Sequence, residues 1–144
     1  MWYELGNVAY VGSGYAFRGK VESDPNGTLV ILQQKDISNL VSMTSEQLAE
    51  DVPQGAALAA DTDNFDKYRV IKGDVLLQLR GGQFLSVVFK ANYPAIAAQG
   101  VAVIRPNAGL LPSYLCWFLN HPSTTEKLRS ISGGTHIPFI SKKA

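Results

Sequence analysis

The stretch 74–90, DVLLQLRGGQFLSVVFK, constrains the fold more than any other part of the sequence. Two apolar runs flank the glycines at 81–82, and glycine adopts the backbone conformations that a tight turn needs. One register places only apolar side chains on one face of such a hairpin, and a shift of one residue would mix the two faces. Its pairs are Val75 with Phe89, Leu77 with Val87, and Leu79 with Leu85. We therefore predict a β-hairpin in this register, with Arg80 and Gln83 at its tip.

Several other segments have clear local signals. Residues 28–32, TLVIL, form an apolar run that is typical of a buried strand. Residues 44–50, TSEQLAE, begin like a capping box and predict a short helix. Residues 51–68 are turn-rich and acidic at their end, which predicts a long loop. Residues 101–105, VAVIR, predict another strand that ends at Pro106.

Two short helices are expected near the C-terminus. The first, 111–120, has Pro112 near its first position, and we expect it to be mostly buried, with Cys116 in the core. The residues that bury it are Leu115, Trp117, Phe118 and Leu119. The second begins with a capping box at 123–126 and runs to about Ile131, before the glycines at 133–134. Because strands dominate, we predict a single α+β domain over 1–144, with a bent antiparallel β-sheet core and short helices near the C-terminus.

Length and composition limit the class of protein. The 144 residues fit one domain, and no apolar run approaches the roughly 20 residues that span a bilayer. The first residues do not form a secretory signal, and the one cysteine, Cys116, can form no internal disulfide. We therefore expect a cytoplasmic protein.

The charges are distributed unevenly along the chain. Residues 1–66 carry 3 Lys/Arg and 10 Asp/Glu, whereas residues 67–144 carry 10 Lys/Arg and 2 Asp/Glu. A net charge of +1 argues against a strongly basic nucleic-acid binder, but this asymmetry allows one positive face. The alternative is a fold that interleaves the two halves and cancels their charges.

The residue pattern does not indicate catalysis. Cys116, His121 and His136 lack the spacing of a zinc site, and the acids at 61, 63 and 66 lack the glycine and glutamate of a calcium loop. The segment 12–20, GSGYAFRGK, lacks the Gly-Lys-Ser/Thr ending of a phosphate-binding loop. The sequence therefore favours a binding module over an enzyme, and we expect no metal and no cofactor.

Several segments, in this order along the chain, resemble the target-recognition domain of type I restriction–modification specificity subunits. They are 2–17 (WYELGNVAYVGSGYAF), 33–37 (QQKDI), 68–81 (YRVIKGDVLLQLRG), 97–106 (AAQGVAVIRP), 112–122 (PSYLCWFLNHP) and 133–143 (GGTHIPFISKK). The resemblance is strongest at 68–81, and together the segments cover nearly the whole chain.

The resemblance implies a non-catalytic protein that recognises one half of a split sequence in duplex DNA. Its partners would be an adenine methyltransferase subunit and, for cleavage, a motor–nuclease subunit. The methyl donor S-adenosylmethionine would belong to the methyltransferase.

Two departures from the family pattern matter. Usual members carry two such domains joined by long helices that dock the partner subunits, and this sequence has no heptad-bearing segment of that length. It is compatible with a half-subunit, an excised domain or a gene remnant. A second interpretation is therefore an assembly module that pairs with an intact specificity subunit or with the methyltransferase. In addition, Gln33 and Gln34 stand where members often have Arg.

The resemblance also gives the segment 12–20 a role. Gly14 and Gly19 would let the backbone turn, Phe17 would anchor the loop in the core, and Arg18 and Lys20 would project toward phosphates. Tyr15 is expected to pack rather than to stack on bases.

Reading bases requires arginine for guanine or an amide for adenine. Five side chains have this chemistry: Gln33, Gln34, Arg80, Gln83 and Gln99. A single exposed arginine such as Arg80 more often only solvates a surface, and His136 is as compatible with a structural role. The predicted DNA-binding residues are Arg18, Lys20, Gln33, Lys35, Arg80, Gln83, Lys90, Thr135 and His136.

Overall fold

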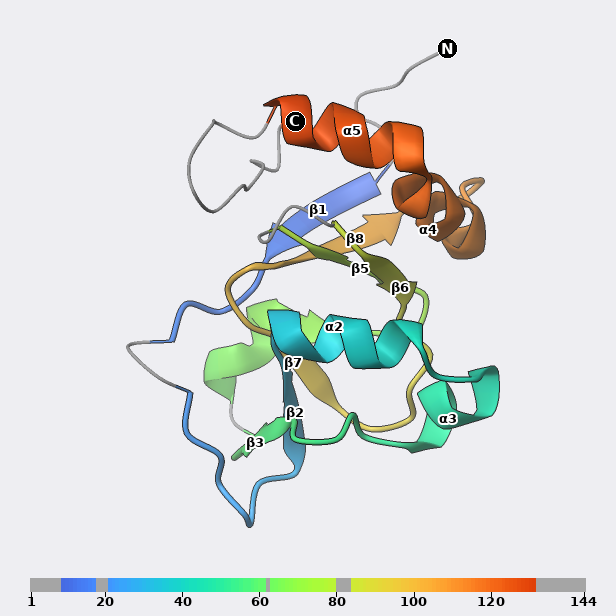
Figure 1. The fold of residues 1–144 in the computed structure, drawn as a ribbon. Coiled ribbons are helices and arrows are strands. Elements are labelled where there is room, and N and C mark those ends of the chain that lie inside the picture. Colours follow the sequence, from blue (N-terminus) through green and yellow to red (C-terminus); the bar gives the residue numbers. More distant parts are fainter. Residues whose placement is uncertain (1–8, 18–20, 62, 80–83, 132–144) are drawn as a thin grey trace.

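The computed structural model describes residues 9–17, 21–61, 63–79 and 84–131 (Figure 1). Its strands are β1 (Ala9–Ser13), β2 (Leu29–Leu32), β3 (Ala57–Ala59), β4 (Arg69–Val70), β5 (Val75–Gln78), β6 (Ser86–Val88), β7 (Ala95–Ala97) and β8 (Val101–Pro106). Its helices are α2 (Gln34–Val41), α3 (Ser45–Glu50), α4 (Pro112–Asn120), α5 (Pro122–Ile131) and the 3-10 helix η1 (Asp63–Tyr68). The predicted α+β class and the short C-terminal helices are confirmed.

The strands form two sheets of four strands each. The first sheet has the order β1-β8-β5-β6, and its pairs are antiparallel. The second has the order β3-β2-β7-β4, in which β2 and β7 run parallel. The β core is thus divided between two sheets, and the structure adds a parallel pair to the expected antiparallel pattern.

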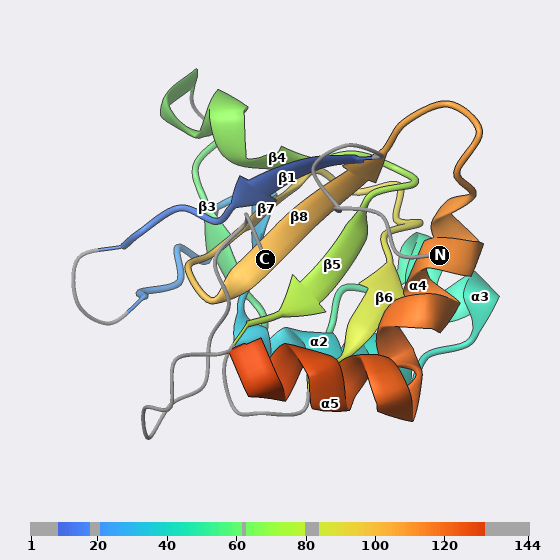
Figure 2. The same cartoon turned by 90° about the horizontal axis from the view of Figure 1, so that it is seen from above.

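The helices separate the molecule into layers (Figures 1 and 2). Helices α4 and α5 lie along the β5–β6 side of the first sheet, where Val75, Leu77 and Ile104 pack against Leu115 and Leu119 of α4. Helix α2 and the second sheet lie on the opposite face, and their core includes Leu76, Val103, Ile37 and Leu32. Strand β5 is therefore buried on both faces.

This burial explains why the predicted hairpin register is wrong. The hairpin exists, but its pairs are Val75 with Val88, Leu76 with Val87 and Leu77 with Ser86, a shift of one residue. All four residues of β5 are buried, so neither face has to be polar and the apolar pattern does not select one register. Phe84, which precedes β6, is fully buried in this register. Its φ of 51° is a conformation that is rare outside glycine.

Several local predictions are confirmed. The run at 28–32 contains the fully buried strand β2. At the start of α3, the Thr44 hydroxyl accepts a hydrogen bond from Gln47 N (3.2 Å), and Thr44 N donates to the Gln47 side-chain oxygen (2.9 Å). Strand β8 ends at Pro106, and α4 has proline at its first turn.

Other local predictions need correction. The sequence analysis predicted no helix directly after β2, but this segment forms α2, whose buried face carries Ile37 and Leu40. The expected long loop at 51–68 contains β3 and η1. In α4, Trp117 is 61% exposed, because Leu115 and Leu119 alone supply the buried side of that helix. Helix α5 begins at Pro122 rather than at a Ser123 cap, and the His121 ring nitrogen Nδ1 accepts from Ser123 N (3.3 Å).

The Gly73-Asp74 turn, at the centre of the strongest family-like segment, is held by an ion pair between a buried carboxylate and a partly exposed arginine. Gly73 has a φ of +95°, which favours glycine. The Asp74 carboxylate is 1% exposed and accepts hydrogen bonds from Arg105 Nε (2.8 Å), Arg105 Nη2 (2.9 Å) and Ile71 N (2.9 Å). This contact fixes the entry into β5 against the end of β8. Within the described residues, no helix has both the length and the apolar character needed to cross a membrane.

Candidate nucleic-acid interface

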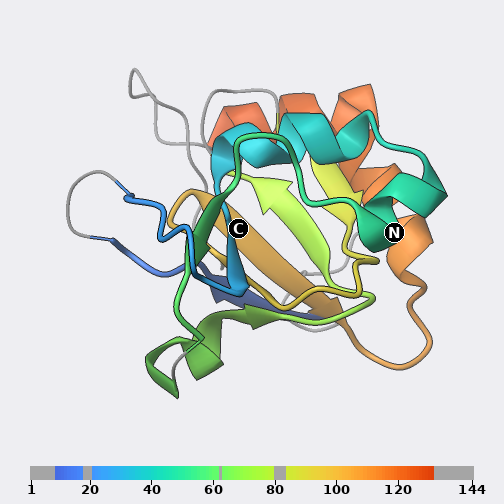
Figure 3. The same cartoon turned by 90° about the horizontal axis from the view of Figure 1, so that it is seen from below.

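Four separate parts of the chain meet at one end of the two sheets. Tyr15 N donates to Ala97 O and Gln99 N donates to Tyr15 O, both at 2.9 Å. Ala98 N donates to Leu32 O (2.9 Å), directly before Gln33. Leu79 N donates to Gly100 O (2.9 Å), which brings the end of β5 to the same turn. Figures 2 and 3 show the end of β5, the β7–β8 turn and the start of α2 on the same side of the molecule.

We call the side chains at this meeting point the polar edge. Its members are Tyr15, Gln33, Gln34, Lys35, Gln78 and Gln99. Gln99 and Lys35 are exposed, whereas Gln33 and Gln34 are half-buried. The edge thus combines amide groups, which can donate to and accept from base edges, with one cation.

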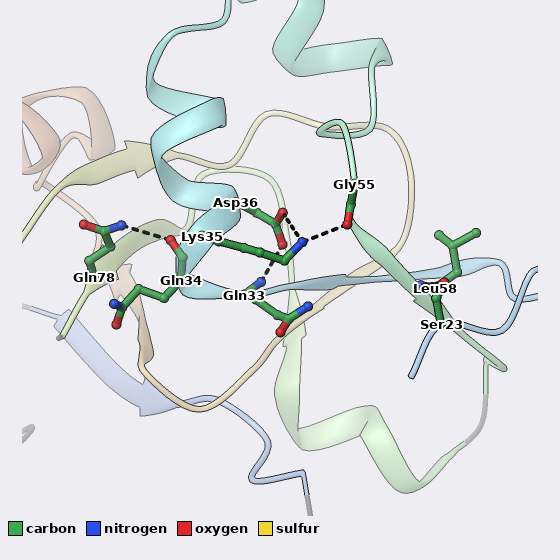
Figure 4. Close-up of polar contacts among 8 residues, drawn as sticks. All are labelled: Ser23, Gln33, Gln34, Lys35, Asp36, Gly55, Leu58 and Gln78. Carbon is green, nitrogen blue, oxygen red and sulfur yellow. Dashed lines mark hydrogen bonds and ion pairs between the residues drawn. The ribbon is translucent and has the colours of Figure 1, made fainter. Parts of the chain in front are cut away.

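The start of α2 is fixed by side-chain contacts (Figure 4). Gln33 N donates to Asp36 Oδ2 (2.8 Å), and Lys35 Nζ donates to Gly55 O (2.8 Å). The same ammonium lies 3.7 Å from Asp36 Oδ1. Lys35 therefore joins α2 to the turn before β3, while its side chain remains 56% exposed.

Asp36 is an unusual buried acid. Its side chain is fully buried, and burial raises its pKa above the ordinary value, although the Gln33 N–H and the Lys35 charge act in the opposite direction. Burial and the Asp36 charge together raise the pKa of Tyr93 to about 12. Neither Asp36 Oδ1 nor Tyr93 OH has a hydrogen-bond partner among the described residues.

Gln78 connects the first sheet to α2. Its side chain is buried, and its amide nitrogen Nε2 donates to Gln34 O at 2.9 Å (Figure 4). Sequence reasoning did not single out this residue. The signal was present, since Gln78 is the one polar residue in the apolar run 75–79.

The N-terminal side of the polar edge rests on an aromatic cluster. The Tyr15 ring makes edge-to-face contacts with Phe17 (4.7 Å between centroids), Phe65 (5.1 Å) and Tyr68 (5.1 Å). Phe17, Phe65 and Tyr68 pack against the core beneath the second sheet. The predicted packing of Tyr15 and the anchoring role of Phe17 are confirmed.

Gly14 is required for a close approach rather than for a turn. A Cβ atom at this position would lie 2.0 Å from Ala98 O and 2.8 Å from Ala97 O. The backbone of 13–15 therefore lies directly against β7, as the isolated parallel bridge between Tyr15 and Ala98 also shows. A side chain is sterically excluded there.

The charge asymmetry of the sequence is partly cancelled in space. Arg69, from the basic half, forms ion pairs with Asp61 and Asp66 from the acidic half. Arg105 is paired with Asp74. Within the part of the chain that the structure describes, Lys67, Lys72 and Lys90 make no ion pair. The cancelling alternative thus holds at Arg69, and the cations without an ion pair among the described side chains are lysines.

Three of the predicted DNA-binding residues lie in the described chain. Gln33 and Lys35 are together at the polar edge, whereas Lys90 follows β6 at the opposite end of the β5–β6 hairpin, next to the Phe89–Asp74 contact. The others lie outside the described residues: Arg18, Lys20, Arg80, Gln83, Thr135 and His136.

Metal-ligating and nucleophilic side chains can be located within the described residues. These residues contain no cluster of three or more His, Cys, Asp or Glu side chains that could hold a metal ion. Burial raises the pKa of the Cys116 thiol, which packs beside Leu115 and Leu119 and is thus a poor nucleophile.

The fold is that of a domain found in type I restriction–modification specificity subunits. One similar solved chain belongs to a type I R-M system described for its complex assembly and conformational transition. It has a TM-score of 0.64 and 20% sequence identity, over 99% of this chain and 31% of that chain.

Two further solved subunits have a similar fold. The HsdS subunit of Thermoanaerobacter tengcongensis has a TM-score of 0.58 and 21% identity, over 83% of this chain and 27% of its own. The S subunit of a type I system from M. genitalium has a TM-score of 0.58 and 12% identity, over 96% of this chain and 30% of its own. The resemblance predicted from the ordered sequence segments is therefore confirmed at the level of the fold.

The sequence comparisons found no match. No family model matches the sequence, and no curated protein matches it. The chain spans between 27% and 31% of the length of the three subunits that share its fold.

Proposed function

We propose that this chain is a non-catalytic target-recognition domain that binds duplex DNA through the polar edge. In this role it is part of the specificity component of a type I restriction–modification system. The observation that carries the proposal is the meeting of Tyr15, Gln33–Lys35 and Gln99 at one end of a fold shared with specificity subunits. Amides that present both a donor and an acceptor suit the adenine edge in the major groove.

The proposal includes partners outside this chain. An adenine methyltransferase subunit would supply the chemistry and bind S-adenosylmethionine, and a motor–nuclease subunit would cleave. The raised pKa of the Cys116 thiol and the packing of that side chain are consistent with a domain that binds rather than reacts.

Binding to duplex DNA over a salt series tests the proposal. Contacts to phosphates release counterions, so the affinity falls steeply as the salt concentration rises. A selection from randomised duplexes by the wild-type protein then gives a preferred sequence, and a scrambled version of it is the control. Failure to bind any duplex at low salt would overturn the proposal.

A second candidate function is assembly with another subunit of such a complex, without direct DNA reading. One observation favours it: Tyr114, Trp117 and His121 form a ladder of rings on the outer side of α4, with centroid distances of 6.0 and 5.6 Å. Tyr114 and Trp117 are both more than half exposed. Copurification with the methyltransferase subunit that is lost in Trp117→Ala would support this candidate, and unchanged copurification would count against it.

A further inference from the structure

Gln78 is a polar side chain in a part of the core that is otherwise apolar. It is 7% exposed, follows Leu77 on β5 and lies opposite Val101 on β8. Leu76, on the same face of the strand, belongs to the core beneath the first sheet. A buried amide is costly unless it is hydrogen-bonded, and the bond from Gln78 Nε2 to Gln34 O satisfies the donor.

The position of Gln78 connects three segments of the polar edge. Its backbone N–H donates to Leu85 O (2.9 Å), which closes the hairpin. The next residue, Leu79, donates to Gly100 O, beside Gln99. Its side chain reaches Gln34, between Gln33 and Lys35.

We propose that Gln78 is a positioning residue, which sets the start of α2 relative to the end of β5 and so determines how Gln33, Gln34 and Lys35 face DNA. This inference rests on the proposed function and adds a residue that does not itself need to touch the ligand. An apolar side chain of similar volume would fill the same space, so the fold does not require an amide here. The donor instead selects one placement of α2 among those that apolar packing alone would allow.

Gln78→Met is the informative variant, because it keeps the length of the side chain and removes the donor. Hydrogen exchange of the amides at 35–38 should become faster by about three- to tenfold, the factor that one neutral hydrogen bond carries. The exchange at Leu40, in the second turn of α2, is the internal reference. Thermal unfolding verifies that the variant folds.

Asn120→Ala is the matched control. The Asn120 side chain accepts from Ser86 N (2.8 Å) and donates to Ser86 O (2.9 Å), so this variant removes hydrogen bonds from the same sheet at the side facing α4. It should leave exchange at 35–38 unchanged relative to Leu40. Faster exchange of the first turn of α2 in Gln78→Met but not in Asn120→Ala supports positioning, and unchanged exchange in Gln78→Met overturns it.

DNA binding separates positioning from a purely structural role. The probe is the duplex selected by the wild-type protein, together with its scrambled version. Gln78→Met should lower the ratio of the two affinities by about threefold or more, and the salt dependence should stay the same because no phosphate contact is lost. If exchange becomes faster but the ratio of the two affinities stays the same, Gln78 does not position the residues that recognise DNA, and the proposal is overturned. Absence of any duplex binding by the wild type would instead overturn the proposed function, whatever the exchange data show.

Discussion

At the scale of single residues, Gly14 is the position where the packing leaves least room. We expect Gly14→Ala to destabilise the protein by about 2 kcal/mol or more, because the new methyl group would meet the backbone of Ala98 and Ala97 rather than a movable side chain. Gly12→Ala is the control: its nearest neighbour is the exposed Tyr10 ring at 3.2 Å, which can rotate away. Denaturant unfolding of both variants gives the comparison, and equal losses would contradict the close approach.

The Asp74–Arg105 pair gives a second prediction at this scale. Asp74→Asn should cost about 2 kcal/mol, below the ~3–5 kcal/mol of a fully buried pair, because the Arg105 guanidinium keeps part of its contact with water. Arg69→Gln should leave the midpoint of thermal unfolding nearly unchanged, since its ion pairs lie at the surface. A larger shift in Arg69→Gln than in Asp74→Asn would contradict this ranking.

Asp36 predicts a specific dependence of stability on pH. Because burial raises the pKa of the folded carboxyl above its usual 3.8, the ionised form opposes folding, and this penalty disappears as the pH falls through the folded pKa. Asp36→Asn has no charge to lose. The stability of the wild type relative to Asp36→Asn should therefore rise as the pH falls from neutral toward 3.8. Thermal midpoints of both proteins over this range measure it, and a difference that moves the other way would show that the Lys35 charge outweighs burial.

At the scale of elements, the hairpin shows how far the sequence can be interpreted. Two apolar runs around glycines were enough to predict the strands, but the register depends on which faces are buried. Both faces of β5 are buried, one against α4 and the other against α2. This burial depends on tertiary packing, which the local sequence does not show. The starts of α3 and α4 could be predicted from Thr44 and Pro112, because the residues that begin a helix are neighbours in sequence. The start of α2 was not predicted. Its contact between Gln33 and Asp36 is local in sequence, but the contacts with Gly55 and Gln78 are tertiary.

A pair of cysteines can verify the hairpin register directly. The bonds from Phe89 N to Asp74 O and from Gln78 N to Leu85 O make Val75 and Val88 a non-hydrogen-bonded pair, for which the Cα separation is about 4.5 Å, within the range of a disulfide. In a Cys116→Ser background, Val75→Cys with Val88→Cys should oxidise readily. The combination of Val75→Cys with Phe89→Cys, the register expected from the apolar pattern, should not. Mass spectrometry under mild oxidation distinguishes the two.

At the scale of the whole molecule, the sequence predicted which types of side chain form the candidate site, but only partly where they lie. Gln33, Lys35 and Gln99 were chosen for their side chains, and the fold places them at one end. Lys90 was chosen in the same way but lies at the other end of the β5–β6 hairpin. Residues far apart in the sequence meet only through the sheet order, which no local pattern encodes.

The two lysines therefore give a test of the interface as a whole. Lys35→Ala should weaken duplex binding and reduce the slope of the salt dependence by about one contact, because a cation at the polar edge is lost. Lys90→Ala removes the same charge from the opposite end and should have the smaller effect. Affinities for duplex DNA measured at several salt concentrations compare the two variants. A larger effect of Lys90→Ala would place the DNA on a different face.

The order of the strands also has a consequence for folding during synthesis on the ribosome. One inner strand of each sheet, β8 or β7, lies at 95–106, whereas the neighbouring strands β1 and β2 emerge much earlier. At ordinary rates of translation, the apolar strand β2 waits roughly 3 to 13 s for β7 to be synthesised. The second sheet lacks β7 until Ala97 is synthesised, and the first lacks β8 until Pro106, so most of the nascent chain must stay soluble without its core. A chain released before Ala95 would have all the strands of neither sheet.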